Sequence, residues 1–351
     1  MSKKRRKINP KDIPFQELME NLKDPAAPLR AALVYRLSEP TDEEMNSFRA
    51  VWPTVPVERR RKVMTRLAET IEDDFEMNYE QVGLFALDDE DPEVRAAAIE
   101  ALWIHSDAAL MQRLIHMMEM DESALVRAGA AAALGRFVLL GDMEEMERSL
   151  ADLVEEALLR VWDTYDEPIE VRRRVLESIA FSGREEVASL IEEALSDHDI
   201  KMRASAVFAM GRSGHERWAD QVIAALDDEE PEIRYEAARA AGELGLVEAR
   251  SRLIELLYDR DREVQENAIW ALGEIGGQEA EQALLHMLDR APDEAFEEMI
   301  EDALSMAALI RGDIAMYIAS DPDFDEEEHL EEEEPLEDDD LSDYPDEIGP
   351  G

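Results

Sequence analysis

A repeat runs through most of this sequence. In each copy a short loop rich in Asp, Glu and Pro leads through an Arg into an Ala-rich stretch, as in 89–101 (DEDPEVRAAAIEA) and 228–245 (DEEPEIRYEAARAAGELG). The equivalent position is held by Arg30, Arg60, Arg95, Arg127, Arg172, Arg203, Arg234 and Gln265, at intervals of 30, 35, 32, 45, 31, 31 and 31 residues. Units of this length bury their apolar faces by stacking on their neighbours. The repeat therefore predicts a solenoid.

Each copy divides into two helical stretches. In one copy, apolar residues recur at helical spacing over 187–195, and a polar loop follows at 196–199. A second stretch over 202–211 carries Ala and Gly residues that permit close helix packing, and Gly214 can adopt a left-handed exit. The predicted unit is an antiparallel helical hairpin, so the predicted fold class is all-α.

These residues resemble the HEAT-repeat family, in particular the short bacterial or phycobiliprotein-lyase-like type. The family pattern Asp-x-x-Pro-x-Val-Arg, then Ala-x-x-Ala-Leu-Gly-x-Ile-Gly, fits well at 88–103, 120–137, 195–214, 226–245 and 257–276. Gln265 in place of the Arg, and Trp103 where a Gly is usual, depart from it. The resemblance implies an α-solenoid, or superhelix, of about nine HEAT-like helical hairpins. It implies little about function, because such repeats serve scaffolds, transport receptors, lyase subunits and a few enzymes.

Charge and spacing divide the chain into domains. Residues 1–11 hold six basic residues and no acid, and are predicted to form a basic disordered arm. The solenoid is expected over 12–318, and an acidic disordered tail over 319–351, with seventeen acids and no Lys or Arg from Asp321 onward. The 45-residue interval predicts a helical insertion at about 139–166, read as one lengthened helix across roughly 142–163.

The body of the chain is strongly acidic. The formal net charge is −49, and residues 12–320 hold 69 acids against 31 basic residues. Nucleic-acid affinity comes largely from Lys and Arg that displace counterions, so direct nucleic-acid binding by the solenoid is disfavoured. The same field attracts basic protein partners, or serves only to keep the chain in solution.

Several functional classes find little support. The chain has no Cys, and no apolar run is expected to approach the ~20 residues of a membrane span, so a cytoplasmic protein without membrane contact is expected. A resemblance to deoxyhypusine hydroxylase would imply iron held by repeated His-Glu pairs, but only His215–Glu216 matches, in a loop between repeats. No enzyme activity, metal or cofactor is predicted.

The candidate site is the concave face of the solenoid. In HEAT hairpins, the first, second, fifth and ninth positions after the repeated Arg face the groove. The predicted partner-binding residues are Phe208, Tyr235, Glu236, Arg239, Glu243, Glu266, Asn267, Trp270 and Glu274. Aromatic anchors among carboxylates suit a basic, partly apolar protein segment. The alternative left open is that these aromatics are packing between repeats.

The repeated arginines receive a structural role. Arg95, Arg127, Arg203 and Arg234 each follow loop acids and are predicted to form an ion-pair ladder between repeats. The predicted function is a non-enzymatic scaffold or adaptor whose acidic groove holds a basic protein or peptide. Two alternatives stay open: a chaperone-like assembly factor that shields a nucleic-acid-binding protein, and a lyase-like subunit for tetrapyrrole attachment.

Overall fold

The computed structural model describes Lys11, residues 13–73 and residues 77–310, and within these the chain forms helices and no strands. The first helices of the nine hairpins are α1 (Phe15–Lys23), α3 (Asp42–Val51), α5 (Glu80–Ala86), α7 (Ala108–Met120), α9 (Arg148–Trp162), α11 (Glu185–Leu195), α13 (Ala219–Ala225), α15 (Arg250–Leu256) and α17 (Gln278–Leu288). The second helices are α2 (Ala31–Tyr35), α4 (Val57–Asp73), α6 (Pro92–Ala101), α8 (Ala124–Asp142), α10 (Ile169–Ile179), α12 (Ile200–Arg212), α14 (Pro231–Glu243), α16 (Arg262–Ile275) and α18 (Glu294–Ile310). Short 3-10 turns precede three of the helices: η2 (Trp52–Thr54), η3 (Glu216–Trp218) and η4 (Val247–Ala249).

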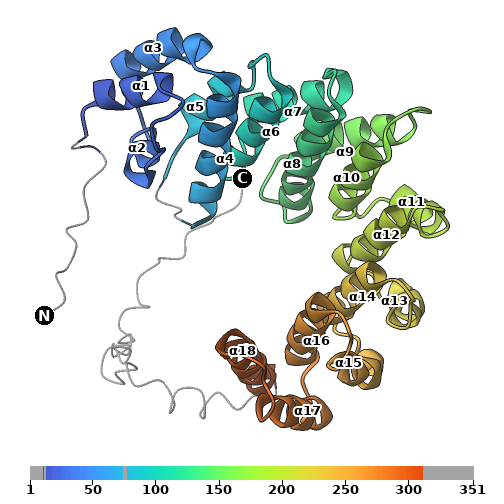
Figure 1. The fold of residues 1–351 in the computed structure, drawn as a ribbon. Coiled ribbons are helices and arrows are strands. Elements are labelled where there is room, and N and C mark those ends of the chain that lie inside the picture. The colour runs from blue at the N-terminus through green and yellow to red at the C-terminus, as the bar shows by residue number, and fades with distance from the viewer. Residues whose placement is uncertain (1–10, 12, 74–76, 311–351) are drawn as a thin grey trace, which may run out of the picture.

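The second helices form one continuous row. Each helix from α4 to α18 in this series packs against the next second helix, while α7, α11, α13, α15 and α17 pack mainly on their own hairpin partners. Figure 1 shows the hairpins on a curved path, with α10, α12, α14, α16 and α18 on its inner side. We call α4, α6, α8, α10, α12, α14, α16 and α18 the inner row. The predicted all-α solenoid of about nine hairpins is confirmed for the described residues.

Loop acids start several of the inner helices. The Asp91 carboxylate accepts hydrogen bonds from the amides of Glu93 and Val94, at 3.1 and 3.2 Å, and Asp199 and Asp261 cap α12 and α16 in the same way. Such caps satisfy amides that have no partner inside the helix. An Asp of the repeat loop is therefore the start signal of α6, α12 and α16, whereas α8, α10 and α14 begin without a side-chain cap.

Glycine sets the spacing of the inner row. A Cβ on Gly242 of α14 would lie 3.0 Å from Ala271 Cα, and one on Gly211 of α12 would lie 2.8 Å from Ala240 Cα. Gly135 and Gly273 have the same register and make similarly close approaches to the next inner helix. Close backbone contact at this position requires the missing side chain. The Gly of the repeat motif is thus explained by packing.

The long interval is filled by two helices, α8 and α9 (Arg148–Trp162), with a turn between them. α8 ends at Asp142, and the chain turns through Met143 and Glu144, whose φ of 59° is left-handed. The amides of Glu145 and Met146 donate to the Leu140 carbonyl, which closes the turn. A separate α9 follows and is the first helix of a regular hairpin with α10. The helix predicted across roughly 142–163 corresponds to α9, which begins at Arg148 because residues 143–147 form the turn. The interval is long because α8 and α9 have 19 and 15 residues.

Helix α8 is also more apolar than the sequence reading allowed. By length and composition alone, Ala124–Asp142 could cross a membrane. Here α8 packs against α6, α7, α9 and α10, and its Val126, Leu134 and Phe137 are fully buried. A buried central helix of a solenoid can therefore be as long and as apolar as a helix that spans a membrane. The predicted basic arm, apart from Lys11, and the predicted acidic tail lie outside the described residues.

Candidate interaction groove

The inner row brings the predicted groove residues onto one surface. Phe208 lies on α12, four of the others on α14 and four on α16. The α14 residues are Tyr235, Glu236, Arg239 and Glu243, and the α16 residues are Glu266, Asn267, Trp270 and Glu274. All are half-buried except Trp270, which is 38% exposed. Three successive helices therefore present these side chains side by side, as the hairpin register predicts.

Phe208 lies between two arginines. The Arg239 guanidinium is 4.6 Å from the centroid of the Phe208 ring, and the Arg212 guanidinium is 5.4 Å from it. Both arginines also meet Glu243: Arg239 Nε donates to its carboxylate at 3.0 Å, and Arg212 Nη2 lies 3.4 Å from it. Phe208 is thus part of a cation–π and ion-pair network within the groove.

Glu236 is the most perturbed acid of the groove. Burial raises its pKa to about 8, and the like charges of Glu177, Glu243 and Glu232 act in the same direction. One carboxylate oxygen is buried without a hydrogen-bond partner, and Arg239 Nη1 is 3.9 Å from it, too far to donate. Burial also raises the pKa of Glu243, against the opposing effect of Arg239. Glu236 is therefore largely protonated and neutral at pH 7.

Polar contacts cross from α10 to α12. Glu177 accepts hydrogen bonds from Ser205 Oγ at 2.6 Å and from Arg174 Nη1 at 2.5 Å. Arg173 Nε donates to Ser205 Oγ at 2.9 Å. The Glu177 carboxylate is thereby neutralised by its own neighbours.

These contacts correct the expectation of a uniformly acidic groove. In the middle of the groove, the groove positions of α8, α10, α12 and α14 hold five arginines against three carboxylates, which are Glu177, Glu236 and Glu243. Those arginines are Arg136, Arg173, Arg174, Arg212 and Arg239. At the C-terminal end, Glu266 pairs with Arg262 at 2.8 Å, while Glu274 has no cationic partner among the described residues. The net acidity of the body therefore lies mostly on other faces.

Trp270 has a packing role as well as an exposed surface. A Cβ built on Gly242 would lie 2.6 Å from Trp270 Cζ3, so the indole covers this glycine of the preceding inner helix. Tyr235 packs against the buried core in a similar half-buried state. The predicted aromatic row is therefore partly structural, and its role in partner binding stays a prediction.

An apolar hollow that the sequence did not reveal lies further toward the N-terminus. It has a volume of about 680 Å³ and lies between α6, α8 and α10, over a floor of small residues. The floor consists of Ala96, Ala128, Gly129, Ala132 and Ala133. Trp103 and Leu125 line it and are 41% and 51% exposed. Large apolar side chains exposed beside an apolar cavity are typical of binding sites.

A second hollow continues the first. It has a volume of about 440 Å³, shares Trp103, Ala132 and Ala133 with the first, and extends to Phe181 and Phe208. We call the two together the apolar trough. Two sequence features point to the trough: Trp103 at a position where the repeat usually has Gly, and the run of small residues on α8. The volume of the hollows could not be predicted, because it depends on how the helices pack.

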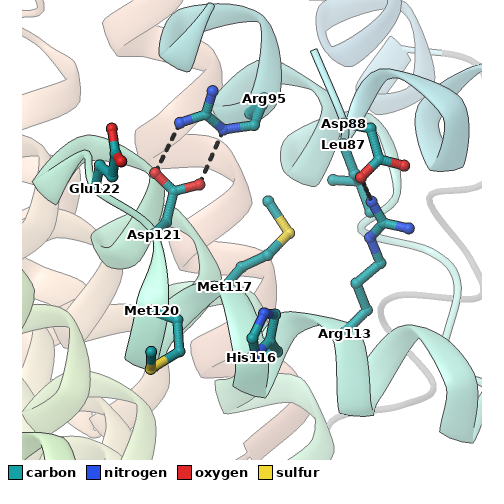
Figure 2. A pocket seen from close by; sticks show the side chains of 9 residues that line it. All are labelled: Leu87, Asp88, Arg95, Arg113, His116, Met117, Met120, Asp121 and Glu122. Atoms are coloured by element: carbon teal, nitrogen blue, oxygen red, sulfur yellow. Dashed lines mark hydrogen bonds and ion pairs between the residues drawn. The ribbon is translucent and has the colours of Figure 1, made fainter. Parts of the chain in front are cut away.

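The repeated arginines link successive repeats. Arg95 Nε and Nη2 donate to the Asp121 carboxylate at 2.9 and 2.7 Å (Figure 2). Arg95 Nη1 donates to the Asp89 carbonyl of its own loop. Arg234 binds Asp259 at 2.8 and 2.9 Å in the same bidentate way. In both cases the acid belongs to the loop of the following repeat.

Other rungs of this ladder vary. Arg127 pairs with Glu167 at 2.8 Å. Arg203 donates only to the carbonyls of Asp197 and His198, with no carboxylate partner among the described residues. Gln265 likewise keeps only the bond to its own loop, to the Asp259 carbonyl at 2.6 Å. Among Arg95, Arg127, Arg203, Arg234 and Gln265, the bond to the residue's own loop is thus the shared feature, and the ion pair between repeats is an addition.

Other clusters do not form a metal site. Within the part of the chain that the structure describes, no three His, Asp or Glu side chains are placed to hold a metal ion. His215 and Glu216 are exposed at the start of η3. A further hollow of about 580 Å³ lies outside the groove. Figure 2 shows the ion pair between Arg113 and Asp88 in this hollow, beside His116.

Comparisons with known proteins give the following matches. A model described as HEAT repeats matches residues 83–164 and 219–305, and one described as PBS lyase HEAT-like repeat matches residues 202–228. The solved complex of CpcE and CpcF of phycocyanin lyase from Nostoc sp. PCC7120 is similar at 15% identity and TM-score 0.49, over 81% of this chain and 97% of that one. Human deoxyhypusine hydroxylase is similar at 19% identity and TM-score 0.35, over 86% of this chain and 97% of that one. Importin beta is similar at 16% identity and TM-score 0.44, over 86% of this chain and 48% of that one. No curated protein matches at a significant level.

Proposed function

The chain belongs to the HEAT-repeat family, and from that premise we propose that it is a non-enzymatic scaffold or adaptor that holds a segment of a partner protein in its concave groove. HEAT solenoids are typical of protein-interaction scaffolds, because stacked repeats create long concave surfaces. The observation that carries the proposal is the apolar trough across α6, α8, α10 and α12, with Trp103 at the junction of its two hollows.

The trough has the composition of a binding surface. Trp103 is partly exposed beside small residues that leave room for a partner side chain. Aromatic residues next to a desolvated pocket contribute a large share of binding energy in protein interfaces. A partner that inserts apolar side chains here buries Trp103 and Leu125 together.

The proposed partner carries basic residues as well. The net charge of −38 over residues 12–320 accelerates the encounter with a cationic protein at low salt. Glu274, at the C-terminal end of the groove, is a half-buried carboxylate that such a residue would meet. Glu236 contributes little to this attraction, because it is largely neutral at pH 7.

Site-specific photocrosslinking tests the proposal. A benzophenone amino acid replaces Ala132 in the trough or, as a control, Leu153, which is 48% exposed on α9. We expect the Ala132 probe to form discrete protein adducts in cells and the Leu153 probe to form none of the same adducts. Trp103→Ala should then weaken the captured interaction by about 2 kcal/mol or more.

The adducts also decide between the alternatives. A nucleic-acid-binding protein among them would favour the assembly-factor function, and a tetrapyrrole-carrying protein would favour the lyase-like one. Equal adducts from both probes, or binding that is unchanged by Trp103→Ala, would show that the groove is not the interaction surface.

A further inference from the structure

One arginine in the groove, Arg136, has no anionic partner among the described residues. Arg136 on α8 lines the second hollow with Trp103, Phe181 and Phe208, and forms no ion pair or hydrogen bond with any described side chain or carbonyl. Its Nε is buried and unsatisfied, and burial lowers the pKa of the guanidinium to about 10. Its one recorded contact is with the neighbouring Phe137 ring, 5.1 Å from the guanidinium.

This isolation is unusual within the same groove. Arg173, Arg174, Arg212 and Arg239 all meet carboxylates there. Glu177 also lines the second hollow, but its oxygens are occupied by Ser205, Arg173 and Arg174. A partly desolvated guanidinium without a counter-charge costs folding free energy, and a chain with 86 acids offers many potential partners. Arg136 is therefore best explained by a ligand that supplies the missing anion.

The surroundings define the chemistry of that ligand. A guanidinium binds a carboxylate through two parallel hydrogen bonds. The walls beside it are Trp103, Leu139, Phe181 and Phe208, which suit an aromatic or branched apolar group. A doubly charged phosphate would be repelled more strongly by Glu177 and by the acidic body. The hollow continues into the rest of the trough, so an extended peptide fits better than a compact molecule.

We propose that Arg136 binds the carboxylate of an Asp or Glu that adjoins an aromatic residue in the partner segment, with the aromatic ring in the second hollow. This rests on the proposed function, since it names the feature by which the bound segment is recognised. The segment then carries an acidic–aromatic element at the trough and basic residues toward the C-terminal end of the groove.

Peptide selection tests the recognition step directly. A display library of nine-residue peptides with a fixed central Phe is selected on the full chain and on Arg136→Gln. On the unaltered chain, Asp and Glu should be enriched over Asn and Gln beside the Phe by about tenfold, as expected when a charge-assisted hydrogen bond is available. Arg136→Gln should lose this preference but still select apolar peptides. Arg136→Lys should restore part of it.

A stability measurement separates recognition from a structural role. Because Arg136 is unpaired, Arg136→Gln should leave the melting temperature of the free chain unchanged or raise it. A clear decrease would show that the arginine holds the fold, which would overturn the proposal.

The outcomes also separate this proposal from the scaffold function. Enrichment of apolar peptides without an acidic preference overturns the role of Arg136 and leaves the groove as a binding site. If neither the unaltered chain nor Arg136→Gln enriches any class of peptide, and Trp103→Ala retains peptides as well as the unaltered chain does, the role of Arg136 and the groove as a binding site are both overturned. Selection that succeeds only after removal of residues 321–351 would mean that the chain's own Asp323–Asp325 segment takes the site, and would overturn binding of a partner.

Discussion

Burial decides which groove residues carry charge. Glu236 is a half-buried carboxylate of the inner row, and burial and neighbouring acids raise its pKa to about 8. The sequence does not reveal this shift, because it depends on which helix packs across the residue. The groove register predicted from the repeat placed Glu236 on the inner row. It could not predict that this carboxyl is largely neutral at pH 7.

The perturbed carboxyl predicts a pH-dependent stability. Below about pH 4.5, Glu236 is protonated in both the folded and the unfolded chain, so it contributes no pH dependence there. Between about pH 4.5 and 8 the unfolded chain has released this proton and the folded chain retains it, so stability falls as pH rises, by at most about 1.4 kcal/mol per unit. Above about pH 8 both states have released it. Glu236→Gln should remove this slope.

The measurement is urea unfolding of the unaltered chain and of Glu236→Gln from pH 5 to pH 9. The difference between the two free energies isolates the one carboxyl from all others that titrate. The variant should gain relative stability as pH rises. A difference that stays constant over this range would show that Glu236 is ionised in the fold.

At the scale of the element, the inner helices are defined by small residues. Gly242 and Gly129 are both helical, but only Gly242 faces backbone of the next helix; a Cβ on Gly129 would meet nothing nearer than Ile99 Cδ1 at 3.8 Å. The hairpins and their starts were predictable, because Asp caps, Pro and the apolar period are local signals. The sequence placed the break between α8 and α9 several residues too early, because the turn lies at Met143 and Glu144, which are neither Gly nor Pro.

Alanine substitutions should separate the two glycines. Gly242→Ala forces α14 and α16 apart and should cost about 1–3 kcal/mol of unfolding free energy. Gly129→Ala gains helix propensity without a clash and should be neutral or stabilising by up to about 1 kcal/mol. Chemical denaturation of both variants tests this, and equal effects would argue against close packing of the inner row.

The ladder makes a second prediction at this scale. Arg234→Gln should keep the bond to the Asp228 carbonyl, as Gln265 does in its own loop, but lose the bidentate pair with Asp259. The expected cost is about 1.5–3 kcal/mol, because Asp259 is left partly buried without its cation. The matched control is Arg203→Gln, whose arginine has no such pair in the described residues and should cost less. If both cost the same, the ion pair between repeats contributes nothing measurable.

At the scale of the whole molecule, stacking turns a local repeat into a long surface. The solenoid follows from the repeat period, since each hairpin contacts mainly its neighbours. The apolar trough does not follow from it, because its volume arises where Ala and Gly of α6 and α8 happen to lie beside Trp103 and Phe181. The sequence reading placed the binding site on α12, α14 and α16, and the trough extends the candidate surface to α6.

Hydroxyl-radical footprinting of the full chain, alone and with the protein captured through the Ala132 probe, tests the role of this surface most directly. If the groove holds the partner, oxidation of Trp103, Phe181 and Phe208 should fall on binding. Oxidation of Tyr165 and Tyr258, which are 102% and 58% exposed away from the trough, should not change. Protection of Tyr165 or Tyr258 with unaltered oxidation of Trp103 would contradict a concave binding site.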